Sequence, residues 1–277
     1  MPASISTILP APEALKHDVE CIRTGEYYGE EAFSISVSPN GLPGIVFQHH
    51  NGYSPVEHIT TPTGYRAQIP TLFLYGQVAV PGVMRHKPGP YTLTQVLLKP
   101  HALHTLFGLN AATLTNSLVA LEELSAAAPG DQLLNASSQQ ERITLITEFL
   151  LARLKASPPR DHLVEESLRL IHRNTGSVQV KWLIKHLNIS ERHFERRFSQ
   201  VVGLSPQRYI RIKRFNHAVT LIKSGRFARF TDVAHTLNYF DESHFIRDIK
   251  ALSGTTPKDL AHKLDGFHPD QRVVAYL

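Results

Sequence analysis

The sequence predicts an α+β protein in which a β-rich N-terminal half precedes an all-α C-terminal half. Three observations support this prediction. Short apolar runs separated by glycine and proline dominate up to about residue 107, apolar residues at helical spacing dominate after it, and the formal charge changes sign near residue 160. Because strands and helices do not alternate, we expect a small antiparallel sheet or barrel and not a doubly wound fold.

The expected strands are short and lie between turn residues. They are the alternating segment 33–37 and the apolar runs 45–47, 72–75, 78–80 and 93–98. Prolines and glycines at 39–44, 62–64, 81–82 and 88–90 mark turns between them. From His101 onward the pattern is helical, and Ser138 with Glu141 is typical of a capping box at a helix start.

The helix that follows Ser138 has one apolar face. Its members are Ile143, Ile146, Phe149, Leu150 and Leu154. A stripe at this spacing either packs on its own domain, which is the commoner outcome, or forms the seam of a homodimer. The spacing leaves both alternatives open.

A linker divides the chain into two predicted domains, residues 1–157 and 160–277. The paired prolines of Ser157-Pro158-Pro159-Arg160 lack backbone donors and resist helix formation. Residues 1–159 hold 9 Lys+Arg and 12 Asp+Glu, a formal charge of −3, whereas residues 160–277 hold 20 and 12, a formal charge of +8. Residues 208–229 carry seven basic residues and no acidic one. This asymmetry indicates either a polyanionic partner for the second domain or a solvated basic surface.

Several classes of protein are disfavoured by composition. One cysteine, Cys21, excludes an intramolecular disulfide and a cysteine-ligand zinc finger, and it fits a reducing compartment. No apolar run approaches the roughly 18 residues of a membrane span, and the first residues lack the pattern of a signal peptide. A phosphate-binding glycine loop, a nucleophile elbow and a dinucleotide fingerprint are also missing. We therefore expect a cytoplasmic protein that is not an enzyme and has no membrane partner.

Sixteen histidines raise the question of a metal site. Those that a β-barrel could gather are His49, His50, His58, His86, His101 and His104. They do not form a His-Glu-x-x-His or comparable motif, and scattered histidines are usually structural. We expect neither a metal nor another cofactor.

The second domain contains two similar segments about 50 residues apart. The shared positions are Asn188, His193-Phe194, Gly203 and Pro206 in the first, and Asn238, His244-Phe245, Gly254 and Pro257 in the second. The offset is 50 at the asparagines and 51 at every later position. The second segment therefore has one extra residue in its turn.

The first segment predicts a helix–turn–helix unit. Asn188 tolerates a left-handed turn, and Ser190 is a favourable N-cap for the helix that follows. Phe194 and Phe198 lie one turn apart and should face the core, with Gly203 ending the helix. The outer face then carries Arg192, Glu195, Arg196 and Ser199.

The second segment predicts a matching unit. Asp241 caps its second helix, and Phe245 and Ile249 face the core. The outer face carries Glu242, Ser243, Ile246 and Arg247. Two such units in tandem indicate DNA binding, because the second helix of each enters a major groove. We therefore predict that the outer residues of both units contact DNA, with arginine reading guanine and glutamate either accepting from cytosine or pairing with a neighbouring arginine.

A helix over residues 206–223 should join the two units. It would span about 27 Å, against roughly 34 Å between successive major-groove faces, so the units could read adjacent turns of one duplex. Its candidate phosphate contacts are Arg208, Arg211, Lys213 and Arg214, and its buried stripe should include Tyr209, Ile212 and Leu221. We expect Trp182, which lies in the first unit, to belong to the core.

The run from Asp232 to Pro257, Asp-Val-Ala-His-Thr-Leu-Asn-Tyr-Phe-Asp-Glu-Ser-His-Phe-Ile-Arg-Asp-Ile-Lys-Ala-Leu-Ser-Gly-Thr-Thr-Pro, closely resembles the signature of the AraC/XylS family of bacterial transcription regulators. The resemblance covers about residues 162–264. It implies a seven-helix DNA-binding domain, a companion domain for effector sensing or dimerisation, and recruitment of RNA polymerase. The chain departs from the family pattern at Asn238 for a turn glycine, Ile249 for an aromatic, and Leu260-Ala261 for Tyr-Arg.

The N-terminal domain has a weaker likeness of its own. Residues 98–108 and 114–116 resemble a segment of one uncharacterised class of companion domains. The sequence as a whole predicts a transcription regulator that binds double-stranded promoter DNA, with an N-terminal domain suited to a small-molecule effector or to a homodimer. Two alternatives stay open: an enzyme domain fused to a DNA-targeting module, and an architectural protein without sequence preference.

Overall fold

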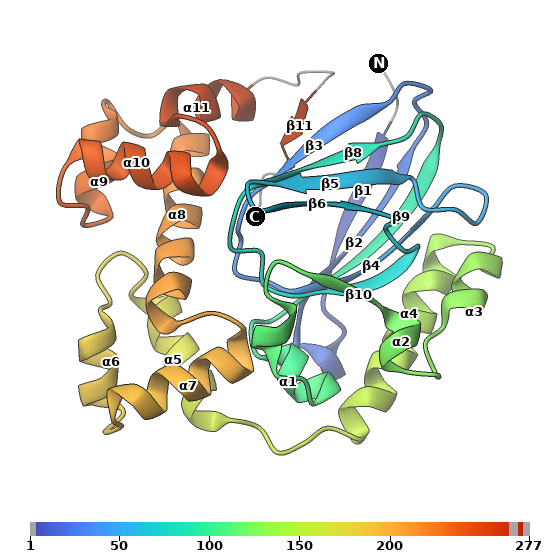
Figure 1. Ribbon diagram of the computed structural model, residues 1–277, viewed down its shortest axis with the longest axis horizontal. Coiled ribbons are helices and arrows are strands. Elements are labelled where there is room, and N and C mark those ends of the chain that lie inside the picture. The colour runs from blue at the N-terminus through green and yellow to red at the C-terminus, as the bar shows by residue number, and fades with distance from the viewer. Residues whose placement is uncertain (1–3, 266–270, 274–277) are drawn as a thin grey trace.

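A β domain and a helical domain stand side by side, joined by an extended linker that follows the last helix of the first domain (Figure 1). The computed structural model describes residues 4–265 and 271–273, so the outer ends of the predicted domains 1–157 and 160–277 lie outside the described residues. The predicted order, a β-rich half followed by an all-α half, is confirmed.

Two sheets form the β domain. One has the order β1-β2-β9-β4-β7-β10, from β1 (Ser4–Pro10), β2 (Val19–Tyr27), β9 (Tyr91–Leu98), β4 (Gly44–His49), β7 (Leu72–Tyr75) and β10 (Leu118–Ala120). The other has the order β11-β3-β8-β5-β6, from β11 (Gln271–Val273), β3 (Phe33–Val37), β8 (Gly82–His86), β5 (Val56–Thr61) and β6 (Gly64–Ala67). All pairings are antiparallel except β11 with β3, which is parallel. Through β11 the chain returns from the helical domain to the β domain.

Four of the five expected strand segments are strands, namely β3, β4, β7 and β9. The prediction of a strand at residues 78–80 is wrong. This segment leaves the sheet after Tyr75, and the Ala79 side chain, 2% exposed, joins the core of the helical domain. Its apolar character reflects burial against helices and not strand pairing.

Helices cover the first sheet, one of them between β1 and β2 and the others after β9 in the chain. They are η1 (Glu13–Leu15), α1 (Ala102–Phe107), η2 (Ala111–Leu114), α2 (Leu121–Leu124), α3 (Gly130–Asn135) and α4 (Gln139–Lys155). Ser138 caps α4, because its side chain accepts a hydrogen bond from the Glu141 amide at 3.2 Å. Ile146 and Leu150 are buried in the core of the β domain. The apolar stripe of α4 thus packs on its own domain, and a homodimer seam there is not available.

The described part of the helical domain contains seven helices, the number that the family resemblance implies. They are α5 (His162–Arg173), α6 (Val180–His186), α7 (Glu191–Val202), α8 (Pro206–Ser224), α9 (Phe230–Thr236), α10 (Glu242–Ser253) and α11 (Pro257–Asp265). One continuous core includes Phe194, Phe198, Tyr209, Phe215 and Phe245, which come from both units and from α8. α8 runs between the two units, with α6 and α7 at one end and α9 and α10 at the other (Figure 1).

Trp182 is not in this core. Its side chain is 44% exposed and stacks on His186 of the same helix, with ring centroids 4.8 Å apart. The expectation that it is buried is wrong, because Leu183 occupies the inward position of α6 and is fully buried.

A buried carboxylate ties the β domain to the linker and to α5. The Asp18 side chain, 1% exposed, ion-pairs with Arg160 through Oδ2, and His101 Nε2 lies 3.4 Å from Oδ1. Arg160 also donates to Glu165 of α5 at 2.9 Å. Burial by itself raises the pKa of Asp18, but the hydrogen bonds from His101 and Arg160 outweigh it and hold that pKa below its ordinary value.

This cluster predicts a loss of stability in acid. Since the folded-state pKa of Asp18 is lowered, the stabilisation is fully present above the unfolded-state pKa near 3.8 and is lost as pH falls through the folded value. The free energy of unfolding, measured by urea titration between pH 6 and pH 2.5, should therefore fall less steeply in Asp18→Asn than in the wild type. Asp131→Asn, at an exposed position on α3, is the control. Equal slopes for wild type and Asp18→Asn would contradict this assignment.

The buried phenylalanines fix the phase of both second helices. Phe194 and Phe245 are 0% exposed, so replacing either by alanine should reduce the free energy of unfolding by about 3–5 kcal/mol. Phe240→Ala is the matched control, because Phe240 is 90% exposed and its loss should change stability by no more than about 0.5 kcal/mol. Chemical denaturation measures both. Full stability in Phe194→Ala would show that the helix phase, and every outward residue assigned from it, is wrong.

Candidate DNA-binding surface and inter-sheet cavity

In the first helix–turn–helix unit, α6 and α7 meet at a left-handed turn. Asn188 has φ of 48°, which asparagine tolerates better than most residues. Ser190 occupies the N-cap position of α7, although its side chain makes no capping hydrogen bond. Phe194 and Phe198 are both fully buried, with ring centroids 5.6 Å apart in an edge-on arrangement. These two rings fix which side of α7 faces outward.

The outward side of α7 carries most of the predicted residues. Arg192, Glu195 and Arg196 are exposed, and Ser199, one turn further on, is half-buried. The neighbouring Arg197 faces elsewhere, and its Nε donates to Asp161 Oδ2 at 2.6 Å at the start of α5. Arg197 therefore holds α7 against α5, a role that the sequence analysis did not assign.

The second unit repeats this geometry. Asn238 has φ of 54°, and its side-chain amide donates to the Gly176 carbonyl at 2.8 Å, which joins the two units. Asp241 caps α10 by accepting from the His244 amide at 2.6 Å. Phe245 is fully buried, as the helical spacing predicts.

The predicted residues of α10 divide into two groups. Ser243 and Arg247 are exposed, and Arg247 Nε donates to the Ser243 carbonyl at 3.3 Å. Glu242 is exposed too, but it accepts from Thr231 of α9 at 2.6 Å. Ile246 is half-buried and packs against the helical core. Ser243 and Arg247 are therefore the two whose side chains are most available to a partner.

Two of the four basic residues of α8 that were predicted as phosphate contacts interact with the second unit. Arg211 ion-pairs with the buried carboxylate of Asp248, to which the Tyr239 hydroxyl also donates at 2.9 Å. The Arg214 guanidinium lies over the Tyr239 ring, 5.4 Å from its centroid. Both arginines therefore brace α10 and the turn before it against α8.

The other two basic residues of α8 face the β domain. Arg208 Nη2 donates to the Ala79 carbonyl at 3.2 Å. Lys213 is half-buried against the turn at Gly41, and burial lowers the pKa of its ammonium group. Gly41 has φ of 78°, and a Cβ there would lie 3.2 Å from Lys213 Cδ, so the turn requires glycine. The sequence could not place these side chains, because their partners are more than 100 residues away along the chain.

The C-terminal ends of both second helices meet the β domain. The Thr115 hydroxyl donates to the carbonyl of Gly203, which ends α7. A Cβ at Gly254, which ends α10, would lie 4.0 Å from Pro81 Cβ. Each helix has 12 residues, so its first turn lies roughly 16 Å from this contact. The N-terminal halves that carry Arg192 and Ser243 therefore lie at the ends remote from the β domain.

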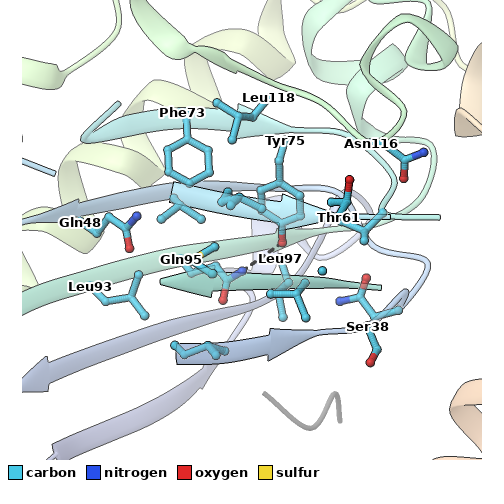
Figure 2. Close-up of a pocket in the computed structure, with 18 of the residues that line it drawn as sticks. Ser38, Gln48, Thr61, Phe73, Tyr75, Leu93, Gln95, Leu97, Asn116 and Leu118 are labelled. Carbon is cyan, nitrogen blue, oxygen red and sulfur yellow. Dashed lines mark hydrogen bonds between the residues drawn. The ribbon is translucent and has the colours of Figure 1, made fainter. Parts of the chain in front are cut away.

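A cavity of about 210 Å³ lies between the two sheets (Figure 2). Its walls are largely apolar. The first sheet contributes Val46, Phe73, Leu93, Leu97 and Leu118, and the second contributes Ile35, Val37, Ile59 and Met84. The cavity exceeds the roughly 150 Å³ of an apolar cavity that admits benzene. It can therefore hold a small organic molecule.

A few polar groups face this cavity. The Tyr75 hydroxyl accepts from Gln95 Nε2 at 3.0 Å, and burial raises the pKa of Tyr75, so the phenol stays neutral (Figure 2). Gln48 Nε2 and Arg23 Nε are buried donors that have no hydrogen-bond acceptor among the described residues. Among the residues that the structure describes, no carboxylate belongs to the lining. A ligand oxygen could accept hydrogen bonds from these donors. Binding of such a ligand is favoured, because a buried donor without an acceptor costs free energy.

Sequence reasoning missed this cavity, because its lining comes from strands spread over residues 23–118 and forms no motif. Of the six histidines considered as metal ligands, His86 alone lines the cavity, stacked on Phe33 with ring centroids 4.6 Å apart. Within the described ranges, no group of three or more histidine, cysteine or acidic side chains is placed to hold a metal ion. In the same ranges, no helix is long and apolar enough to cross a membrane.

Comparisons with known proteins match the two domains separately. Residues 183–263 match a family described as a helix-turn-helix domain, and residues 6–120 match a domain of unknown function, DUF6597. The HTH-type transcriptional activator RhaS of Escherichia coli strain SE11 is 30% identical over 91 residues, which are 32% of this chain and 32% of RhaS. The chain thus spans about a third of the length of the curated relatives it matches.

Solved structures give lower identities. ToxT from Vibrio cholerae O395 is 10% identical with a TM-score of 0.48, covering 95% of this chain and 98% of that chain. An AraC-type DNA-binding protein from Chromobacterium violaceum is 18% identical with a TM-score of 0.35, covering 38% of this chain and 95% of that chain.

The helical half is a helix-turn-helix DNA-binding domain, with both units formed as the sequence predicts. The matches agree with the resemblance to the AraC/XylS family that residues 232–257 carry, and they locate it in this domain.

Proposed function

We propose that this chain is a transcription regulator that binds double-stranded promoter DNA through α7 and α10, placed in adjacent major grooves. One observation carries the proposal. The two units present equivalent exposed side chains, Arg192 and Arg196 in one and Ser243 and Arg247 in the other, at the ends remote from the β domain. α8, with 19 residues, separates the units by about 28 Å, close to one turn of the duplex.

Base reading falls mainly to the arginines. The guanidinium fork of Arg196 or Arg192 matches guanine O6 and N7. Glu195, Ser199, Glu242 and Ile246 have smaller roles, since Glu242 already has a partner in Thr231 and Ile246 is half-buried.

Phosphate contacts by the α8 residues would have to compete with protein contacts that the structure already gives them. A phosphate contact by one of these residues would replace an interaction that it makes within the protein. They are Arg208, Arg211, Lys213 and Arg214. Lys181 and Lys185 of α6 are exposed and basic, and they are better placed to bind the backbone without disturbing the fold.

Regulation of transcription follows from this binding mode by contact with RNA polymerase at the promoter. The relative RhaS is an activator, which supports activation as the sign of regulation. Such a protein works in the cytoplasm.

A homodimer would need a face other than the buried side of α4, and the two units in one chain already allow a single copy to occupy two grooves.

The inter-sheet cavity is proposed as the site of a small-molecule effector. Its apolar walls and its donors Gln48 and Arg23, which have no acceptor among the described residues, suit a mostly apolar molecule that carries one oxygen acceptor, neutral or anionic. The matched domain of unknown function, residues 6–120, includes all of the lining.

The key residue for base reading is Arg196. Arg196→Ala should weaken binding to the specific site by about 1–3 kcal/mol and binding to random duplex much less, because the lost hydrogen bonds are to base edges. Fluorescence anisotropy with a site selected by the wild-type chain from random duplexes measures both. Arg196→Lys should restore affinity for random DNA without restoring specificity, since lysine keeps the charge and loses the planar fork.

Lys185→Ala is the reference for a phosphate contact. It should weaken specific and random binding alike and lower the salt dependence by about one counterion. If Arg196→Ala showed this second pattern, Arg196 would belong to the backbone contacts and Arg192 would become the guanine reader. Equal affinity of the wild type for its selected site and for random duplex would instead favour an architectural protein.

The cavity can be tested with phenylacetate and phenylacetamide, an anionic and a neutral molecule of similar size. A bound molecule should raise the melting temperature of the wild type, and Gln48→Leu should weaken its binding by about tenfold, because the amide donor is lost. Gln140→Leu, at an exposed position outside the cavity, is the control. A preference of the wild type for phenylacetate would assign the oxygen partner to Arg23. The same ligand affinity in wild type and Gln48→Leu would contradict the role of Gln48.

A further inference from the structure

One segment of the β domain lies between the C-terminal ends of the two recognition helices, α7 and α10. This rim segment, residues 76–82, runs from β7 to β8. At one end, Gln77 lies beside Gly203, where a Cβ would be 3.3 Å from Gln77 Cγ. At the other end, Pro81 lies beside Gly254, where a Cβ would be 4.0 Å from Pro81 Cβ. Side chains at the two ends of one short segment therefore lie beside the C-terminal ends of both helices.

The middle of the rim segment is held inside the helical domain. Ala79 is 2% exposed and belongs to the helical core. Its amide donates to Asn116 Oδ1 at 2.7 Å, and its carbonyl accepts from Arg208 of α8 at 3.2 Å. The segment is thus fixed to the β domain on one side and to the helix that joins the units on the other.

Neighbouring contacts reinforce this arrangement. Thr115, next to Asn116, donates to the Gly203 carbonyl at the end of α7. Gln77 Nε2 donates to the Gly41 carbonyl at 3.2 Å, and Asn216 of α8 donates to the adjacent Asn40 carbonyl at 2.8 Å. Three loops of the β domain, around residues 40, 79 and 116, therefore act on α8 and on the end of α7 together.

The same loops border the inter-sheet cavity. Val78, Val80 and Gly82 of the rim segment belong to its lining, as does Asn40. Asn116 lines it too (Figure 2). A change in the shape of the cavity therefore acts on the backbone that separates the recognition helices. In addition to α8, the β domain bonds to the end of α7 at Gly203 and lies beside the end of α10 at Gly254, so both α8 and the β domain bear on that separation.

We infer that the rim segment is a positioning element that sets the distance between α7 and α10, and hence the spacing of the two half-sites that the protein reads. The positioning residues are Ala79 of the rim segment and Thr115 and Asn116 of the neighbouring loop that holds it, and they act through the recognition helices without touching DNA. This inference rests on the proposed function, since half-site spacing has meaning only if both helices enter major grooves. It assigns to the β domain a part in choosing the DNA sequence, beyond any binding of a ligand.

The test measures affinity against half-site spacing for the full chain. A two-part site is selected from random duplexes by the wild type, and duplexes with one base pair added or removed between the halves are compared with it. The wild type should lose about tenfold or more in affinity at the altered spacings. In the double variant Thr115→Val/Asn116→Gly, the loss of affinity at the altered spacings should be less than about threefold, because the helices are no longer held at one separation.

The substitutions are chosen to spare the fold. Asn116 has φ of 56°, which glycine adopts without strain, and valine has the shape of Thr115 without its hydroxyl. Asn51→Gly is the matched control, because Asn51 has φ of 50° in an exposed turn of the β domain and should keep the wild-type profile. Thr115→Val alone repeats the test if the double variant does not fold.

The outcomes separate the two proposals. A wild-type spacing profile in a folded variant would overturn the inference, and α8 would then set the spacing by itself. A wild type that selects no two-part site, or that binds every spacing equally, would count against the proposed binding through two adjacent grooves and would overturn the inference with it. A profile that is sharp in the wild type and flat in the variant supports both.

Discussion

The inward packing of one aromatic side chain in each recognition helix determines everything that the DNA-facing surface can present. Phe194 and Phe245 are fully buried, and each fixes the rotation of its helix about the helix axis. A helix turns by about 100° per residue, so a slip of one position would turn Arg196 away from its outward direction. The polar surface is thus specified by apolar packing. For that reason, substitutions in the core and on the surface should differ in kind, one affecting folding and the other affecting recognition.

The positive charge of the helical domain serves two purposes. Part of it is used within the protein: Arg160 pairs with Asp18, Arg197 with Asp161 and Arg211 with Asp248. These pairs join the linker, α5, α7, α8 and α10, and each has a carboxylate that is at most 12% exposed. The remaining exposed basic residues supply the positive field that the proposed function requires. A count of charges along the chain therefore overstates how many of them face DNA.

The sequence was informative where structure is local and less so where it depends on distant contacts. The turns at Asn188 and Asn238, the Asp241 cap and the buried phenylalanines follow from spacing within about 15 residues, and all were predictable. The cavity was not, because strand pairing brings its lining together from across the β domain. The segment at Val78–Val80 was predicted as a strand, since the apolar pattern alone cannot distinguish burial by a sheet from burial by another domain. For the same reason the partners of Arg208 and Lys213 could not be foreseen.

Ala79 limits how freely the two domains can be exchanged. Its methyl group completes a core that otherwise consists of residues from the helical domain. In a chimera joined at the linker, residues 157–160, another sensor domain would replace the β domain, and Ala79 would be lost with it. A loop of the new sensor would then have to fill the space that Ala79 occupies in the helical core. Recombination between relatives should therefore succeed most readily when the loop between β7 and β8 is inherited together with the helices, although the two lie far apart in the gene.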